Sequence, residues 1–308
     1  MSFTLAHLSD VHLGDLPELR WRHWGLKRGL GYLNWHRNRK HVHLRSTLAL
    51  LLADLAAQAH DHVTVTGDLV NIGLPSEYER ARDWLTALGP PDRVTVVPGN
   101  HDVYVRLRSD PGVARWSSYM RPSATEPGQN GPDAPLTFPF LRRFGRVALI
   151  GLNSAVPTPP LIAAGNLGRP QRQALGTLLD TLADQGMIRV VLIHHPPLPG
   201  QASRVKALRD ATELSELLAR HGAELVLHGH NHRFAVREHP TVGGAAIPVI
   251  GVPSASVGHI HKNETLARYH LFRFAWDGKA PAIEMIARGL AAPDGPVVEI
   301  ERRRISGV

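Results

Sequence analysis

Short runs of β-branched and aliphatic residues recur along the chain, and each run is bounded by polar or turn-forming residues. Such runs are typical of buried strands. They predict strands at residues 3–9, 62–66, 94–97, 147–153, 188–193 and 225–228. Leucine and alanine at helical spacing predict helices between them, at residues 43–59, 75–88, 170–184 and 211–221. This alternation of strands and helices is typical of a parallel α/β fold.

Polar positions define the boundaries of these elements. We expect Ser76 to cap the helix at 75–88, with Glu79 three residues later completing the cap. Pro and Gly are frequent at 106–138, which predicts a long irregular loop. The chain shows no internal repeat and no linker, so we expect a single domain over residues 1–308.

The last part of the chain alternates in the way that antiparallel strands do. These strands are expected at residues 247–252, 267–276 and 282–290. Asp277-Gly278 predicts a hairpin turn between the last two. The tail Arg302-Arg303-Arg304 is expected to be solvated.

Side chains suited to metal binding follow five of the predicted strands. The motifs are Asp10-x-His12, Gly67-Asp68, Gly99-Asn100-His101-Asp102, His194-His195-Pro196 and Gly229-His230-Asn231-His232. Open α/β sheets place their ligands at the carboxyl ends of strands, so we expect these side chains to meet there. In an extended chain, residues i and i+2 point the same way, so Asp10 and His12 can hold one cation together. A carboxylate just past a glycine, as at Asp68, can approach two cations.

Composition narrows the chemistry of this site. The 308-residue chain contains no cysteine and 19 histidines, so any metal must be held by nitrogen and oxygen. Such ligands suit two divalent ions of the manganese, iron or zinc type. One bridging carboxylate with ligands on either side suits a pair of ions that clamps a phosphoryl group during displacement.

The five motifs, in this order, resemble the calcineurin-like metallophosphoesterase family from residue 10 to residue 232. The resemblance implies an α/β fold, a two-sheet αββα sandwich with mixed sheets and the metal site at strand ends. It implies a first metal on Asp10, His12 and His232, a second on Asn100, His194 and His230, and a bridge through Asp68. It also implies that His101 faces the phosphate and stabilises or protonates the leaving oxygen, with Asp102 orienting it. The implied nucleophile is a metal-bridging hydroxide.

Other histidines are not expected to bind the metals. The His-x-Pro spacing of the family selects His194 over His195, and His228 lies in an apolar run that predicts the core. Gly258-His259-Ile260-His261 mimics the last motif, but it follows a Ser- and Gly-rich segment, so it lines the substrate pocket at most. No metal role is expected for four histidines of the basic segment described next: His23, His36, His41 and His43.

The formal net charge of +8 comes from one segment. No Asp or Glu lies between Leu19 and Ala53, whereas that stretch contains Arg20, Arg22, Lys27, Arg28, Arg37, Arg39, Lys40 and Arg45. Aromatic residues are interleaved with them: Trp21, Trp24, Tyr32 and Trp35. A minimal member of the family lacks this insertion at about residues 19–45. One interpretation is a solvated face; the other is a cap that meets an anionic substrate, a membrane surface or nucleic acid through residues 20–45.

The opening Leu-Ser-Asp-x-His and the Gly-Asn-His-Asp motif are similar to those of bacterial cyclic-nucleotide phosphodiesterases. They imply hydrolysis of a 3′,5′-cyclic nucleotide or a similar small phosphodiester. A first alternative is a membrane-surface hydrolase of a lipid-linked phosphodiester or pyrophosphate, such as a UDP-diacylglucosamine, although relatives of that type tend to carry Arg in place of His101. A second alternative is a nuclease.

The sequence also bears on where the protein acts. It has no apolar run long enough to span a bilayer and no basic leader, so we expect a cytoplasmic protein, or one peripheral to the inner membrane surface. Every ligand position of the family is filled, which argues against a non-catalytic scaffold. No pattern in the chain indicates an oligomeric state.

Overall fold

The computed structural model describes residues 2–107, 110–122, 135–260, 263–276 and 281–306. The predicted Asp277-Gly278 turn, His261 and part of the 106–138 loop lie outside the described residues. In the rest of that loop, a 3-10 helix forms at Gly112–Met120.

The first sheet has the strand order β12-β11-β10-β1-β2-β3. Its parallel part is formed by β1 (Ser2–Leu8), β2 (His62–Val65) and β3 (Val94–Val96). An antiparallel part continues from β1 through β10 (Arg268–Ala275), β11 (Ala282–Leu290) and β12 (Val297–Ser306). The predicted change from parallel to antiparallel pairing is therefore present in this sheet.

The second sheet has the strand order β4-β5-β6-β7-β9-β8. Parallel strands form its centre: β5 (Val147–Gly151), β6 (Ile188–Leu192), β7 (Leu225–His228) and β9 (Ala246–Gly251). Antiparallel strands close its two edges: β4 (Phe140–Phe144) and β8 (Ala235–Pro240). The prediction of antiparallel pairing for residues 247–252 was thus incomplete, because β9 is parallel to β7 and antiparallel only to β8.

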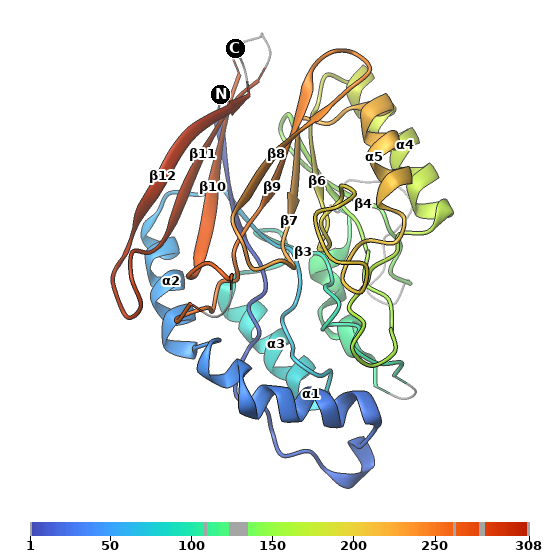
Figure 1. Cartoon of the computed structure of the whole chain (residues 1–308). Helices are drawn as coiled ribbons and strands as arrows, with labels where there is room; N and C mark the ends of the chain where they lie inside the picture. The colour runs from blue at the N-terminus through green and yellow to red at the C-terminus, as the bar shows by residue number, and fades with distance from the viewer. Residues whose placement is uncertain (1, 108–109, 123–134, 261–262, 277–280, 307–308) are drawn as a thin grey trace.

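The two sheets pack face to face, with helices on the outside (Figure 1). The larger core fills the space between the sheets, where Leu5, Val190 and Phe272 are fully or almost fully buried. A second core lies under α4 (Arg169–Asp184) and α5 (Ala211–His221). The helices α2 (Arg45–Ala57) and α3 (Pro75–Leu88) pack against the first sheet. This arrangement confirms the predicted αββα sandwich.

The basic segment forms a separate helical element at one end of the sandwich. It contains α1 (Leu26–Arg37), flanked by short 3-10 helices at Trp21–His23 and Arg39–His41. Trp35, within α1, is buried. Figure 1 shows α1 at the end of the molecule opposite the two chain termini.

Two boundary predictions were wrong. Ser76 lies inside α3, because Pro75 begins the helix with a fixed φ and no N–H to satisfy. The carboxylate of Glu77, not of Glu79, accepts hydrogen bonds from the backbone N–H groups of Asn71, Ile72 and Leu74. At the other end of the chain, the three arginines of the tail are exposed as expected, but they lie on the edge strand β12.

Candidate metal centre

The predicted ligands lie just past the ends of β1, β2, β3, β6 and β7. Of seven non-glycine residues with positive φ among the described residues, five are predicted ligands: Asp10, His12, Asp68, His230 and His232. A left-handed backbone is costly for a residue with a side chain, and such residues concentrate at functional sites. The turns after β1, β2 and β7 are therefore shaped to aim these side chains at one place.

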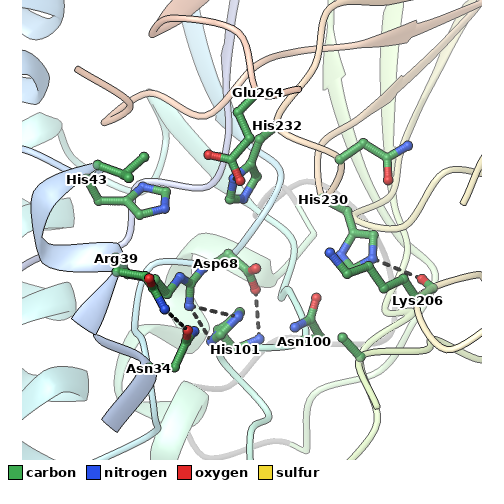
Figure 2. Close-up of a pocket in the computed structure, with 14 residues that line it drawn as sticks. Asn34, Arg39, His43, Asp68, Asn100, His101, Lys206, His230, His232 and Glu264 are labelled. Carbon is green, nitrogen blue, oxygen red and sulfur yellow. Dashed lines mark hydrogen bonds and ion pairs between the residues drawn. The ribbon is translucent and has the colours of Figure 1, made fainter. Parts of the chain in front are cut away.

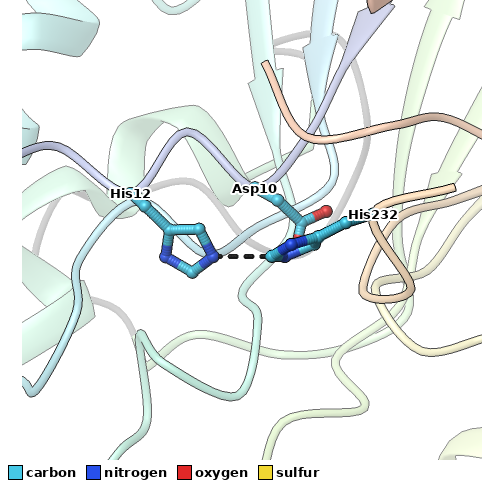
Figure 3. Close-up of side chains that lie close together, drawn as sticks. All are labelled: Asp10, His12 and His232. Carbon is cyan, nitrogen blue, oxygen red and sulfur yellow. Dashed lines mark hydrogen bonds and ion pairs between the residues drawn. The ribbon is translucent and has the colours of Figure 1, made fainter. Parts of the chain in front are cut away.

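Asp10, His12 and His232 form one buried group (Figure 3). The Nε2 atoms of the two histidines lie 3.4 Å apart, and Nε2 of His232 lies 3.2 Å from Oδ1 of Asp10. A second buried group contains Asp68, His194 and His230. In it, Nε2 of His194 lies 3.2 Å from Nδ1 of His230 and 3.1 Å from Oδ1 of Asn100.

Asp68 lies between the two groups. Its Oδ2 atom is 3.9 Å from Nε2 of His12 and 3.5 Å from Nε2 of His194. Its other oxygen accepts the backbone N–H of His101 at 2.7 Å (Figure 2). The carboxylate is therefore held in an orientation from which one oxygen reaches both groups.

Each histidine of the two ligand groups has an inner nitrogen, which faces the other ligands, and an outer nitrogen, which points away from them. The outer nitrogen of all four rings faces a hydrogen-bond acceptor. Nδ1 of His12 and of His194 donates to the carbonyl oxygens of Val70 and Thr66, at 3.3 and 2.6 Å. Nε2 of His230 donates to the carbonyl of Lys206 at 2.9 Å, and Nδ1 of His232 lies 3.3 Å from the carboxylate of Glu264.

A carbonyl can only accept, so the inner nitrogens of the first three rings carry lone pairs when the rings are neutral. The inner lone pairs of His194 and His230 thus face one another across 3.2 Å, and the inner lone pair of His12 faces Nε2 of His232 across 3.4 Å. A cation would stabilise both arrangements.

The protonation tendencies of the imidazoles differ within each group. Burial opposes the charged form of His194, but Asp68 and Asp10 raise its pKa above the usual value. Burial lowers the pKa of His12 and of His230 well below the usual value, and neighbouring cationic groups add to this. Burial, together with Asp10 and Asp102, raises the pKa of Asp68 to about 7 against the opposing effect of His194. Burial also disfavours the charged form of His232, but Asp10 and Glu264 raise its pKa to about 9.

The resemblance implied that Asp102 orients the ring of His101, but the two side chains have other partners. The carboxylate of Asp102 accepts backbone N–H groups of Asp68, Leu69, Val70 and Gly99, so it fixes the turn that carries Asp68. The His101 ring is oriented instead by the carbonyl of Asn71, to which Nδ1 donates, and by stacking on Tyr104. The pocket-facing Nε2 of His101 lies 3.1 Å from Nη1 of Arg39.

Four other histidines considered in the sequence analysis lie in different surroundings. Nδ1 of His195 faces the hydroxyl of Ser154, and its Nε2 faces the carbonyl of Ala163, so both nitrogens are occupied outside the ligand groups. Its ring packs against that of His230, with ring centres 4.5 Å apart. His228 is buried in β7, and His259 is exposed. His43, for which no role was expected, is buried beside the rings of His12 and His232.

Sequence reasoning therefore missed three residues of this site: Arg39, His43 and Glu264. All three line a cavity of about 300 Å³ that also contains Asp68, Asn100 and His230 (Figure 2). His43, His232 and Glu264 form a third group with ligand atoms close together. The absence of acidic residues around Arg39 and His43 was the one sequence signal for two of them, and Glu264 had none.

Two adjacent groups of buried imidazole and carboxylate side chains at the edge of a two-sheet sandwich are typical of metal-dependent phosphoesterases. The family model of the calcineurin-like phosphoesterases matches residues 3–234, and the chain belongs to that family. Its relatives are metal-dependent hydrolases, and this chain is one as well. No helix in the described residues combines the length and apolarity needed to cross a membrane.

Among known proteins, the chain is 26% identical to a probable cyclic nucleotide phosphodiesterase of Synechococcus sp. over 83% of this chain and 82% of that protein. It is 29% identical to the glycerophosphodiester phosphodiesterase GpdQ of Enterobacter lignolyticus over 61% of this chain. That second match spans 62% of the relative's own length.

Solved structures share the fold. A dimetal phosphatase from Danio rerio aligns with a TM-score of 0.55 at 15% identity, over 99% of this chain and 98% of its own. A purple acid phosphatase from yellow lupin, Lupinus luteus, aligns with a TM-score of 0.56 at 13% identity, over 99% of this chain and 54% of its own.

Proposed function

We propose that the protein hydrolyses a small phosphodiester with the help of two divalent metal ions, and that a 3′,5′-cyclic nucleotide is the leading substrate. The observation that carries the proposal is the position of Asp68 between two groups of imidazoles whose inner nitrogens face one another. The relatives support the diester over a monoester, because both curated matches are named phosphodiesterases.

The residues present fit two such ions. Asp10, His12 and His232 would hold the first, Asn100, His194 and His230 the second, and Asp68 both. The ions would supply Lewis-acid stabilisation of the phosphoryl group and activation of a water. His101 would contact the substrate through Nε2, since its Nδ1 is occupied by the carbonyl of Asn71. Asp102 would keep Asp68 in place through the four backbone N–H groups that it accepts.

The test is a hydrolysis panel with the manganese-loaded protein. Its substrates are 3′,5′-cyclic nucleotides, an aryl phosphodiester, an aryl phosphomonoester, single-stranded DNA and a nucleotide-linked lipid. Asp68→Ala should lose both the metal and the activity, while Asp83→Ala, an exposed aspartate on α3, should retain both. Hydrolysis of the monoester alone would refute the diesterase proposal. A preference for DNA would favour the nuclease alternative.

A second candidate is hydrolysis at an anionic membrane surface, and one observation favours it. Leu26, Leu30 and Leu33 share a face of α1 at helical spacing and are exposed, Leu26 to 75%. Trp21, just before the helix, is 85% exposed. Arg20 before the helix and Arg37 in its last turn are exposed, and interfacial helices combine such features. Lys27 and Arg28 instead donate to the carbonyls of Thr158 and Gly73. Leu30 also lines a smaller cavity that adjoins His101, so this face lies near the site.

Vesicle co-sedimentation separates this candidate from the first. If it is correct, the protein should bind vesicles that contain phosphatidylglycerol more tightly than vesicles of phosphatidylcholine alone. The double variant Trp21→Ser/Leu26→Ser should lose that binding, whereas Val242→Ser, at an exposed site outside the insertion, should keep it. Equal sedimentation with and without vesicles would exclude the membrane candidate.

A further inference from the structure

We propose that Arg39, supplied by the basic insertion, binds the phosphoryl group of the substrate at the metal centre. This inference rests on the proposed phosphodiesterase function and names a residue that the five strand-end motifs do not contain. The guanidinium lies inside the cavity next to His101, opposite His230 (Figure 2). Its Nη2 atom is 2.9 Å from Nε2 of His12, and its Nη1 atom is 3.1 Å from Nε2 of His101.

The surroundings of Arg39 leave its charge available to a ligand. Within the described residues, its guanidinium forms no ion pair with a carboxylate, and its hydrogen-bonding contacts are the two imidazoles. A planar guanidinium offers five N–H donors in a fork that matches two oxygens of a phosphate. The carboxylates of Asp68 and Glu264 act on its charge without pairing with it. A largely buried guanidinium that is in contact only with neutral rings is incompletely compensated, and a phosphoryl dianion or monoanion would supply a paired charge.

The contact with His12 would change when the site is loaded. Nδ1 of His12 donates to the carbonyl of Val70, so Nε2 has one lone pair to offer. Arg39 and a metal ion compete for that lone pair. A metal on His12 would release Nη2 of Arg39, which remains in the cavity and free to donate to an anionic oxygen. Arg39 would thus acquire its function when the metal binds.

The backbone around Arg39 is fixed to the body of the protein, which makes the placement of the guanidinium specific. Arg39 begins a 3-10 helix directly after α1, and Trp35 and Val42 on either side are buried. The N–H of Leu44 donates to the carbonyl of Ser256 at 2.8 Å, and the N–H of Gly258 donates to that of Val42 at 2.9 Å. The insertion is therefore joined by backbone hydrogen bonds to the loop after β9, beside the metal centre.

The experiment measures binding of inorganic phosphate to the manganese-loaded protein by titration calorimetry, together with the metal content of each variant. Arg39→Ala should weaken phosphate binding by about 10- to 100-fold, the usual effect of losing a charged hydrogen-bonding partner. Arg39→Lys should be intermediate, because lysine keeps the charge but not the fork. The control is Arg37→Ala, which removes an exposed arginine from the last turn of α1 and should leave phosphate binding unchanged.

Metal content should stay at the wild-type level in all three variants. Unchanged phosphate affinity in Arg39→Ala would overturn the proposal. Loss of metal from both Arg39 variants would also overturn it, since Arg39 would then support the metal centre itself. The proposed function fails separately: if the wild-type protein hydrolyses no phosphodiester while Arg39→Ala still weakens phosphate binding, the anion site stands and the diesterase proposal falls.

Discussion

At the scale of single residues, Glu264 illustrates how an outer contact can set the properties of a ligand. Its carboxylate faces Nδ1 of His232, and the opposite nitrogen of that ring faces Asp10. Carboxylates that hold the outer nitrogen of a histidine orient the ring and strengthen it as a metal ligand. Glu264 would act on the first ion in this way, through His232.

Replacing Glu264 should therefore weaken binding of the first ion. Glu264→Gln keeps the size of the side chain and removes its charge, and such changes reduce metal affinity by about 10- to 100-fold. Calorimetric titration of the metal-free protein with manganese would measure the change. Glu238→Gln, on an exposed position of β8, is the matched control and should leave the affinity as it is. Identical affinities for the two variants would rule out this role for Glu264.

Metal binding should also depend on pH, with a sign that follows from two ligands. The pKa of Asp68 is raised to about 7 and that of His232 to about 9 in the metal-free protein. A metal binds only the deprotonated forms, so it must displace a proton from His232 below pH 9 and from Asp68 below pH 7. The affinity for the first ion, which His232 would bind, should therefore rise by about tenfold per pH unit between pH 7 and 9.

Proton release can be measured directly. Titrations in buffers with different heats of ionisation should show about one proton released per first ion at pH 8, and more at pH 6. An affinity that stays constant from pH 6 to 9, with no proton release, would contradict the assignment of these two residues as ligands.

At the scale of elements, the turns after β2 and β3 pack so closely that their glycines have no room for a side chain. A Cβ atom at Gly99, after β3, would lie 2.2 Å from Oδ1 and 2.5 Å from the backbone N of Asp68. The turn after β2 meets the turn after β3 at this point, and Gly67 there has a φ of 91°. The glycines allow the two strand ends to approach closely enough for Asp68 to reach both ligand groups.

Gly99→Ala should therefore displace Asp68. We expect the variant to bind less metal and to lose about 1–3 kcal/mol of unfolding free energy through overpacking. Metal analysis and urea unfolding would measure both effects. Gly25→Ala provides the control, because a Cβ there meets nothing within 4 Å. Full metal content in Gly99→Ala would show that the turn can relax without moving the carboxylate.

The elements also show what the sequence could predict. Strands and their polar ends were predictable, because alternation, glycine and proline are local signals and the structure agrees with them. The contacts of Asp102 and Arg39 were not, because they depend on which turn or insertion packs beside which strand end. Ser76 was misassigned for a local reason: Pro75 and the buried Glu77 determine the start of α3.

At the scale of the whole molecule, the candidate centre joins the two sheets. Asp10, Asp68 and Asn100 follow strands of the first sheet, whereas His194, His230 and His232 follow strands of the second. The sheets already touch here, since the backbone N–H of His230 donates to Oδ2 of Asp10 at 2.9 Å. Each proposed ion would add bonds across this same junction.

Metal binding should consequently stabilise the sandwich as a unit. With free manganese at 100 times its Kd, each ion adds about 2.7 kcal/mol to the free energy of unfolding, because the unfolded chain does not bring the two sheets' ligands together. Thermal unfolding should shift upward with manganese and return on addition of a chelator. Asp68→Ala should lose most of the shift, because it removes the ligand shared by both ions, whereas Asp83→Ala should keep it. An undiminished shift in Asp68→Ala would place the stabilising ions outside the junction between the sheets.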